Sequence, residues 1–259
     1  MAADHLVVES DGPLLRVTIN RLEKRNALSR AVLNEIATTF TEHAGNPQIK
    51  AVVLTGAGDK SFAAGGDLHD LANVRTEAEA LAMSREARRS LTSVAQFPVP
   101  VIAALNGDAL GGGAELAVAC DFIVAASTSR IGFIQGKLNI STAWGGGIRL
   151  RQRIGMTQAL RLLSRAELLG ASDAERIGLV DCTAAPDQSL DACVHEFCHP
   201  ILQQAPQVLR AFKALTTAHD KDTSVDVLKD IETRHFVSTW IHDDHWAVAD
   251  EVLNARRSQ

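Results

Sequence analysis

The pattern of hydrophobic and polar positions predicts alternating strands and helices. Residues 14–19 alternate between apolar and polar side chains, which is typical of a half-buried strand. Continuous apolar runs that begin at Ala51 and at Val99 are typical of buried strands. Between them, residues 29–43 carry apolar side chains at helical spacing, and Ser29 is a suitable N-cap. The order recurs around Phe122, so we expect an α/β or mixed fold class.

Helical patterns dominate elsewhere. Residues 68–96 are polar and rich in alanine and arginine, and they predict a surface helix. Beyond Ala171, helices are expected near residues 172–178, 188–203, 206–218 and 223–238. We therefore divide the chain into a core, residues 1–190, and a helical region, residues 191–259. The apolar faces of that helical region need a covering surface.

A glycine-rich turn follows the apolar run at 99–105. Gly111 to Gly113 precede Glu115, and the apolar stretch Leu116–Cys120 predicts a buried helix. Backbone N–H groups at a helix start carry partial positive charge, and glycines let a carbonyl oxygen approach them. Glu115 falls in the first helical turn, within reach of whatever this turn holds. A purely structural turn would also tolerate a glutamate there, because it complements the helix dipole.

A second glycine-rich turn strengthens the functional interpretation. The strand from Ala51 runs into the loop Ser-Phe-Ala-Ala-Gly-Gly-Asp (61–67). Two turns of this kind could each supply one N–H group to a single carbonyl oxygen. That arrangement is an oxyanion hole, which stabilises negative charge as it develops on the oxygen.

Composition narrows the class of partner and the compartment. The chain has 26 Lys plus Arg against 31 Asp plus Glu, a net charge of −5, without a basic block, so we expect no nucleic-acid partner. The apolar runs are too short to cross a bilayer, and the first residues lack a signal-peptide pattern. Four cysteines without paired spacing suggest reduced thiols. We expect a cytoplasmic protein that does not contact membranes.

Several motifs in order resemble the crotonase superfamily, the enoyl-CoA hydratase/isomerase family. The strongest are the two glycine turns, 61–67 and Asn-Gly-Asp-Ala-Leu-Gly-Gly-Gly-Ala-Glu-Leu (106–116). The other matches are Asn-Arg-Leu-Glu-Lys-Arg-Asn-Ala-Leu (20–28), Cys-Asp-Phe-Ile-Val-Ala (120–125), Trp-Gly-Gly-Gly-Ile-Arg-Leu (144–150) and Ala-Glu-Arg-Ile-Gly-Leu-Val (174–180). The resemblance implies a ClpP-like spiral of ββα repeats, and a C-terminal helical region that forms a homotrimer or a hexamer.

The resemblance also implies roles for individual residues. Gly66 and Gly112 match the positions whose amides form the oxyanion hole, and Ala64 matches a backbone position that contacts the adenine of coenzyme A. Lys24 and Arg25 match basic residues near the CoA phosphates, although a solvated turn would explain them equally well. The implied substrate is an acyl-CoA thioester. Coenzyme A is then part of the substrate, and no separate cofactor is expected.

The acid/base positions depart from the family pattern. Glu115 matches the first of two glutamates in hydratases, but Gln135 occupies the position of the second. Hydration uses one group to activate water and one to protonate the α-carbon, and an amide cannot exchange protons near neutral pH. The sequence therefore predicts a hydratase-like lyase with weakened acid/base chemistry.

Two alternatives stay open. Trp144, followed by glycines, and Thr239-Trp240 are similar to the ethylmalonyl-CoA and methylmalonyl-CoA decarboxylase branch. An apolar wall at Trp144 would favour loss of CO₂ by desolvating a substrate carboxylate, although ordinary packing would also explain this residue. The second alternative is a non-catalytic acyl-CoA binder, which would not need Glu115.

A possible metal cluster carries less weight. Cys193, His195, Cys198 and His199 are close in sequence, but on one helix Cys193 points away from the other three. We therefore expect no metal site.

Overall fold

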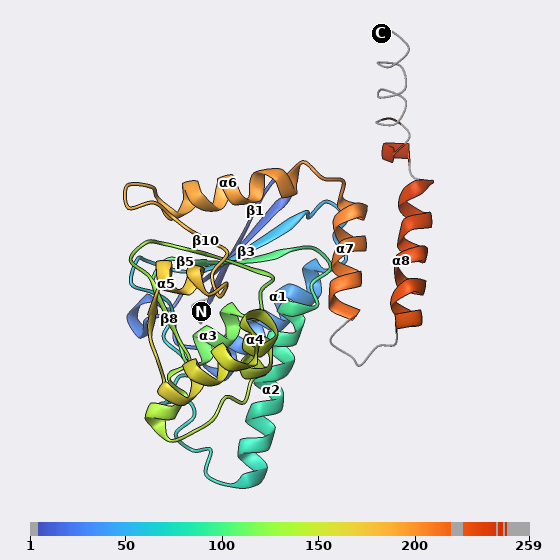
Figure 1. Ribbon diagram of the computed structural model, residues 1–259. Coiled ribbons are helices and arrows are strands. Elements are labelled where there is room, and N and C mark those ends of the chain that lie inside the picture. The colour runs from blue at the N-terminus through green and yellow to red at the C-terminus, as the bar shows by residue number, and fades with distance from the viewer. Residues whose placement is uncertain (1–4, 219–224, 242, 246, 248–259) are drawn as a thin grey trace.

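The computed structural model describes residues 5–218, 225–241, 243–245 and 247, and in this part of the chain the strands form two sheets (Figure 1). The larger sheet contains, in spatial order, β1 (Leu6–Asp11), β2 (Leu14–Ile19), β3 (Ala51–Gly56), β5 (Val101–Leu105), β7 (Phe122–Ala125) and β10 (Cys182–Thr183). The smaller sheet contains β4 (Ser61–Ala63), β6 (Asp108–Leu110), β8 (Arg130–Gly132) and β9 (Leu169–Gly170). All neighbours are parallel except the pairs β1–β2 and β8–β9.

The two sheets arise from a repeated ββα unit. In each repeat one strand joins the larger sheet, the next strand joins the smaller sheet, and a helix follows. The repeats are β3–β4 with α2 (Glu77–Ala95), β5–β6 with α3 (Gly112–Ala117), and β7–β8 with α4 (Gly146–Arg165). This architecture confirms the expected spiral of ββα repeats.

The burial of the strands follows their hydrophobic patterns. Every residue of β3 and β5 is buried, as expected for central parallel strands covered on both faces. In β2, Leu15, Val17 and Ile19 face the core, while the residues between them are partly exposed. The half-buried strand predicted at residues 14–19 is confirmed.

The early helices begin at recognisable caps. The Oγ atom of Ser29 accepts a hydrogen bond of 3.3 Å from the N–H of Val32, which starts α1 (Arg30–His43) as predicted. The α2 helix starts at a capping box formed by Thr76 and Glu79. Only Glu77–Ala95 of the region 68–96 is helical, and residues 68–73 before it form turns.

The α3 helix ends earlier than its hydrophobic pattern suggested. We expected a helix over Leu116–Cys120, but α3 ends at Ala117. Turn hydrogen bonds then reverse the chain, and Asp121 is fixed to β5 because its side chain and its N–H both bond to Val101. The apolar stretch is buried as expected, yet half of it serves as a connection into β7.

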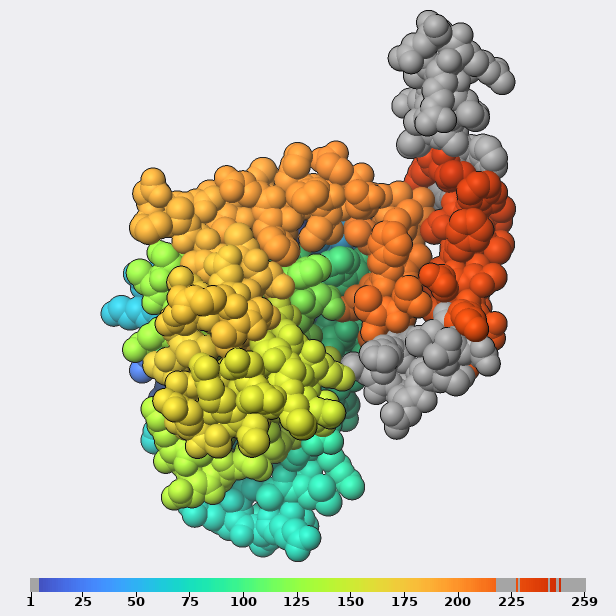
Figure 2. All heavy atoms as spheres, viewed as in Figure 1, coloured from blue at the N-terminus to red at the C-terminus, as the bar shows by residue number. Residues whose placement is uncertain are grey.

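The C-terminal half contains the predicted helices. They are α5 (Ala171–Arg176), α6 (Leu190–Leu202), α7 (Pro206–Ala218) and α8 (Val225–Trp240). The α6 helix packs on the larger sheet, where Cys193, Val194 and Cys198 join a core cluster with β3 and β5. Figures 1 and 2 show α7 and α8 beside the main body, with α8 on the outer side. The division of the chain at residue 190 stays a prediction, and α6 packs with the core.

No helix in the described part of the chain combines the length and the apolar character needed to span a membrane.

Candidate active site

Strand pairing brings the two glycine turns together. The strands β4 and β6 are parallel neighbours in the smaller sheet, so the turns that follow them lie at the same edge. Their contact is close: a methyl group built on Gly65 would lie 3.1 Å from the carbonyl oxygen of Leu110 and 3.7 Å from the nitrogen of Gly112. Two segments about fifty residues apart in sequence thus form one site.

Hydrogen bonds of neighbouring groups orient the Gly66 amide. The Leu28 N–H donates to the Gly65 carbonyl (2.8 Å), and the Asp67 N–H donates to the Leu28 carbonyl (3.0 Å). Since the C=O and N–H groups of a trans peptide point in opposite directions, the Gly66 N–H points away from Leu28.

The Gly112 amide is oriented in a similar way. The Gly111 carbonyl accepts a hydrogen bond from the Glu115 N–H (3.0 Å) and therefore points into α3. The Gly112 N–H points out of the helix start, where helical hydrogen bonding offers it no acceptor. Gly66 and Gly112 both line the same cavity. The bridge to Leu28 and the α3 helix fix these two peptides in orientation. The N–H groups of Gly66 and Gly112, which are predicted to form the oxyanion hole, have no hydrogen-bond partner among the described residues.

Glu115 is buried and held by three donors. Its Oε2 atom accepts hydrogen bonds from the backbone N–H groups of Trp144 (3.0 Å) and Gly146 (2.8 Å). Its Oε1 atom accepts a hydrogen bond of 2.9 Å from Nε2 of Gln135. The carboxylate is therefore fixed in orientation, and it lines the cavity beside the two glycines.

Opposing effects set the proton affinity of Glu115. Burial raises the pKa of Glu115 above the usual 4.5 of a glutamate, because the charged form loses hydration. The hydrogen bonds from Gly146, Trp144 and Gln135 favour the charged form and only partly offset this rise. A carboxylate whose pKa is shifted toward neutrality is suited to both removing and returning a proton.

Gln135 offers one unused hydrogen-bond acceptor. The residue is 8% exposed, and its Oε1 atom is buried without a partner among the described residues. A buried carbonyl oxygen without a donor is costly and therefore indicates a missing donor, such as a water molecule or a substrate hydroxyl. Gln135 cannot replace a second glutamate as an acid, but it can hold such a donor beside Glu115.

Trp144 packs against both oxyanion glycines. A methyl group built on Gly66 would lie 3.3 Å from Cη2 of the indole, and one built on Gly112 would lie 2.3 Å from Cζ3. Only glycine fits Gly112 next to this ring. The indole of Trp144 thus lies against both predicted oxyanion glycines, and its role as an apolar wall stays a prediction.

Apolar side chains complete the cavity, which has a volume of about 170 Å³. Besides the residues already described, the lining includes Leu68, Leu71, Met83, Ile134, Leu138 and Ile140. No lysine or arginine belongs to the described lining. Sequence patterns alone did not single out these apolar residues.

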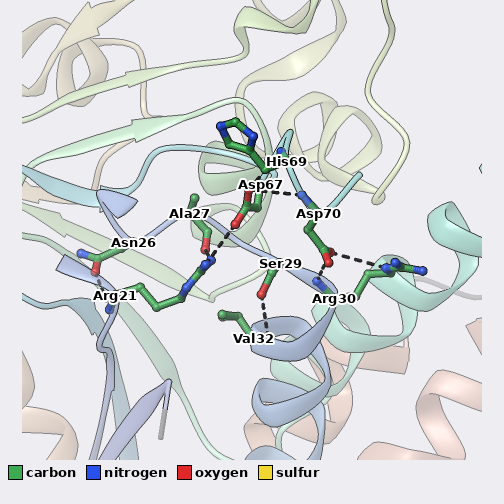
Figure 3. Close-up of polar contacts among 9 residues, drawn as sticks. All are labelled: Arg21, Asn26, Ala27, Ser29, Arg30, Val32, Asp67, His69 and Asp70. Carbon is green, nitrogen blue, oxygen red and sulfur yellow. Dashed lines mark hydrogen bonds and ion pairs between the residues drawn. The ribbon is translucent and has the colours of Figure 1, made fainter. Parts of the chain in front are cut away.

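An ion-pair network braces the first glycine turn (Figure 3). The guanidinium of Arg21 donates to Oδ2 of Asp67 (3.0 Å) and to the Ala27 carbonyl (2.6 Å). The Oδ1 atom of Asp67 accepts from the N–H groups of His69 (3.1 Å) and Asp70 (3.4 Å). Burial raises the pKa of Asp67, but the bonds from Arg21, Asp70 and His69 outweigh it, and the net pKa lies below 3.8. These bonds hold Asp67, the residue that follows Gly66, in place.

Replacing Asp67 with asparagine is expected to destabilise the fold by about 1–3 kcal/mol, because hydrogen bonds to a buried charge are lost. Since the pKa of Asp67 is lowered in the folded state, its contribution is present above the unfolded pKa and disappears as pH falls through the folded pKa. Urea unfolding across pH should show the difference between variant and wild type shrinking under acid conditions. The matched control is Asp191→Asn, which removes an exposed ion pair with Arg16 and should cost under about 1 kcal/mol. Equal effects of the two substitutions would contradict a bracing role.

The proposed CoA contacts lie next to the cavity. The N–H of Ala64 donates to the Arg25 carbonyl (3.1 Å), which joins the turn at residues 24–25 to the cavity edge. Ala64 lines the cavity, whereas Lys24 and Arg25 are exposed outside it. The guanidinium of Arg25 lies 4.0 Å from the carboxylate of Asp108. The structure therefore places these residues together without defining a phosphate site.

The cysteine and histidine cluster divides between two faces of α6. Cys193 and Cys198 are buried against the sheet, while His195 and His199 are exposed. Our expectation that Cys193 alone points away was wrong, because Cys198 also packs into the core. Burial raises the pKa of Cys198 to about 11, so its thiol is neutral near pH 7. Within the described residues, no group of three potential metal ligands is present.

The fold and the site define a member of the crotonase superfamily, an enzyme with a buried carboxylate beside two free amides. A model of the enoyl-CoA hydratase/isomerase family matches residues 9–250, and the chain belongs to this family. A crotonyl-CoA hydratase of Syntrophomonas wolfei is 34% identical over 236 residues, which are 91% of this chain and 90% of the relative. A short-chain-enoyl-CoA hydratase of Clostridium acetobutylicum is 34% identical over 213 residues, 82% and 81% of the two chains. The crystal structure of an enoyl-CoA hydratase from Bacillus anthracis superposes with a TM-score of 0.88 at 29% identity, covering 98% of this chain and 96% of that one.

Proposed function

We propose that the protein hydrates 2-enoyl-CoA thioesters. The observation that carries this proposal is the carboxylate of Glu115, fixed by three N–H donors beside the free amides of Gly66 and Gly112. Relatives named as crotonyl-CoA hydratase and short-chain-enoyl-CoA hydratase support it.

The geometry suggests a mechanism with one carboxylate. The thioester oxygen accepts hydrogen bonds from the Gly66 and Gly112 amides, which stabilise it as it becomes an enolate. Glu115 takes a proton from a water molecule whose oxygen adds to the β-carbon, and it returns that proton to the α-carbon. The Oε1 atom of Gln135 accepts the other hydrogen bond of the water and orients it. One water molecule is consumed and no external proton is needed.

The CoA portion is proposed to lie across the edge formed by Ala64 and the Lys24–Arg25 turn. The Ala64 backbone would contact the adenine, and the two exposed cations would lie near the phosphates. The reaction requires no cofactor besides the coenzyme A of the substrate, because the amides stabilise the charge and Glu115 moves the proton.

Decarboxylation of a malonyl-type thioester, such as ethylmalonyl-CoA or methylmalonyl-CoA, is a second candidate. The observation in its favour is the indole of Trp144 against both oxyanion glycines, in a cavity without lysine or arginine among its described lining. A substrate carboxylate in such surroundings is poorly solvated, and loss of CO₂ would produce the same stabilised enolate.

Product masses distinguish these candidates. The purified protein is incubated with crotonyl-CoA and, separately, with ethylmalonyl-CoA, and the thioesters are analysed by mass spectrometry. Addition of one water to crotonyl-CoA supports the proposal, while loss of CO₂ from ethylmalonyl-CoA supports the second candidate. Binding of butyryl-CoA without either reaction would identify a non-catalytic acyl-CoA binder and overturn both.

We also propose a cytoplasmic homotrimer or hexamer, assembled through α7 and α8. Large apolar side chains are exposed there at Phe212, Val227, Phe236, Val237 and Trp240. An exposed apolar surface of this kind is typical of a protein interface. The cytoplasmic assignment is supported by the four free cysteines, which suit a reducing compartment.

Light scattering tests the assembly. The expected mass is three or six times the 27.7 kDa of one chain at micromolar concentration. Phe236→Glu should shift the population to smaller species, because a buried unpaired charge opposes assembly. Met156→Glu, on the exposed face of α4, is the matched control and should leave the mass unchanged. A monomeric wild-type protein would contradict the proposal.

A further inference from the structure

Trp144 separates two hollows of the molecule. On one side it lines the active-site cavity of about 170 Å³. On the other side it lines a second hollow of about 200 Å³ between α2 and α4, which is more open to solvent. The second hollow is lined by Arg88, Thr92, Gln96, Trp144, Gly145, Ile148, Arg149 and Gln152. Trp144 is the residue that both linings share.

The indole of Trp144 is held in place between the two hollows. Trp144 is 7% exposed, and its ring contacts the backbone of Gly66 and Gly112. The backbone N–H of Trp144 donates to Oε2 of Glu115 (3.0 Å). The preceding carbonyl, of Ala143, accepts hydrogen bonds from Ser84 (2.8 Å) and Arg88 (3.2 Å) of α2. These bonds fix the backbone at residues 143–144, and burial against the two glycines limits rotation of the ring.

Three of the other apolar lining residues are much more exposed than Trp144, while Leu71, Met83 and Ile134 are partly buried. Leu68, Leu138 and Ile140 are each more than half exposed, so they lie at the mouth of the cavity. Trp144 is buried and has empty space behind it. The depth of the cavity is therefore set at Trp144.

We propose that Trp144 is the end wall of the acyl pocket and restricts the protein to short-chain acyl-CoA thioesters. This inference rests on the proposed function for its class of ligand. The cavity of about 170 Å³ ends at this buried indole, so the last methylenes of a longer acyl chain would meet the ring. Removing the indole would join the cavity to the hollow between α2 and α4 and admit a longer chain.

The test measures binding of saturated acyl-CoAs from butyryl to decanoyl, by calorimetry, to the full-length protein. Wild type should lose about tenfold or more in affinity between hexanoyl-CoA and decanoyl-CoA, because the added methylenes meet the wall. Trp144→Ala should bind decanoyl-CoA about tenfold or more tightly than wild type, with a smaller change for butyryl-CoA. Adding Thr92→Trp to Trp144→Ala refills the hollow and should restore the wild-type loss.

Two further variants serve as a replacement for Trp144→Ala and as a control. Trp144→Leu shortens the wall while keeping an apolar side chain, and it replaces Trp144→Ala if that variant fails to fold. Met156→Ala, on an exposed part of α4, should keep the chain-length dependence of wild type. An unchanged dependence in a folded Trp144 variant, or equal wild-type affinity for butyryl-CoA and decanoyl-CoA, would overturn the inference.

Saturated thioesters cannot be hydrated, so the binding result is independent of turnover. If chain-length selection depends on Trp144 but crotonyl-CoA is not hydrated, the proposed function is wrong and this inference is supported. If crotonyl-CoA is hydrated but chain-length selection does not depend on Trp144, the proposed function is supported and this inference is wrong. Failure of every acyl-CoA to bind would overturn both.

Discussion

Replacing Glu115 with glutamine is expected to lower kcat for crotonyl-CoA hydration by about 10²–10⁴-fold, because the only carboxylate among the described lining residues of the cavity is lost. The fold should survive. The new amide oxygen can accept from Trp144 and Gly146, and Gln135 can rotate its own amide to accept from the new NH₂ group. Stopped-time assays with mass detection measure the turnover.

Affinity for butyryl-CoA is the control for this substitution. It should change by no more than a few-fold, since the amides of Gly66 and Gly112 and the cavity wall are untouched. Turnover close to wild type would show that another group moves the proton. In wild type, kcat should also fall as the solution is acidified through the raised pKa of Glu115, because only the carboxylate form accepts a proton. The acid limb of the pH profile is therefore expected above the ordinary 4.5.

Replacing Gly112 with alanine is expected to lower kcat/KM by about 10²–10³-fold. The new methyl group would lie 2.3 Å from Cζ3 and 2.8 Å from Cη2 of Trp144, so either the ring or the start of α3 must move. Moving the start of α3 displaces an oxyanion donor, and losing one such donor carries a penalty of this size. Steady-state kinetics with crotonyl-CoA provide the measurement.

Two comparisons isolate the cause. Gly45→Ala places a methyl group in open space and should leave kinetics unchanged. Adding Trp144→Ala to Gly112→Ala removes the clash, so the double variant should recover much of the loss relative to Trp144→Ala alone. If Gly112→Ala behaves like wild type, the position of this amide does not matter for catalysis.

The sequence anticipated elements whose signals are local. The buried strands β3 and β5 are continuous apolar runs, and α1 has both an apolar stripe and a capping serine. The helix expected at Leu116–Cys120 extended past the observed end at Ala117, because hydrophobicity reports burial and cannot distinguish a buried helix from a buried connection. Family motifs, rather than periodicity, indicated that the two glycine turns meet.

Long-range contacts explain what the sequence could not reveal. The strands β4 and β6 have three residues each, too few to show a period, yet their pairing creates the site. The two backbone donors that fix Glu115 come from Trp144 and Gly146, about thirty residues further along the chain. The glycines at 145–147 are visible in the sequence, but the sequence does not show why residue 146 must be glycine. A methyl group on Gly146 would lie 2.3 Å from Cγ of Glu115.

The main chain and the side chain of residue 144 have separable tasks. The N–H group orients the base, and every amino acid except proline can supply it. The indole shapes the acyl pocket, and it can be exchanged without removing that N–H. Substitutions at residue 144 can therefore change which acyl groups bind, while Glu115 and the backbone N–H that orients it stay unchanged.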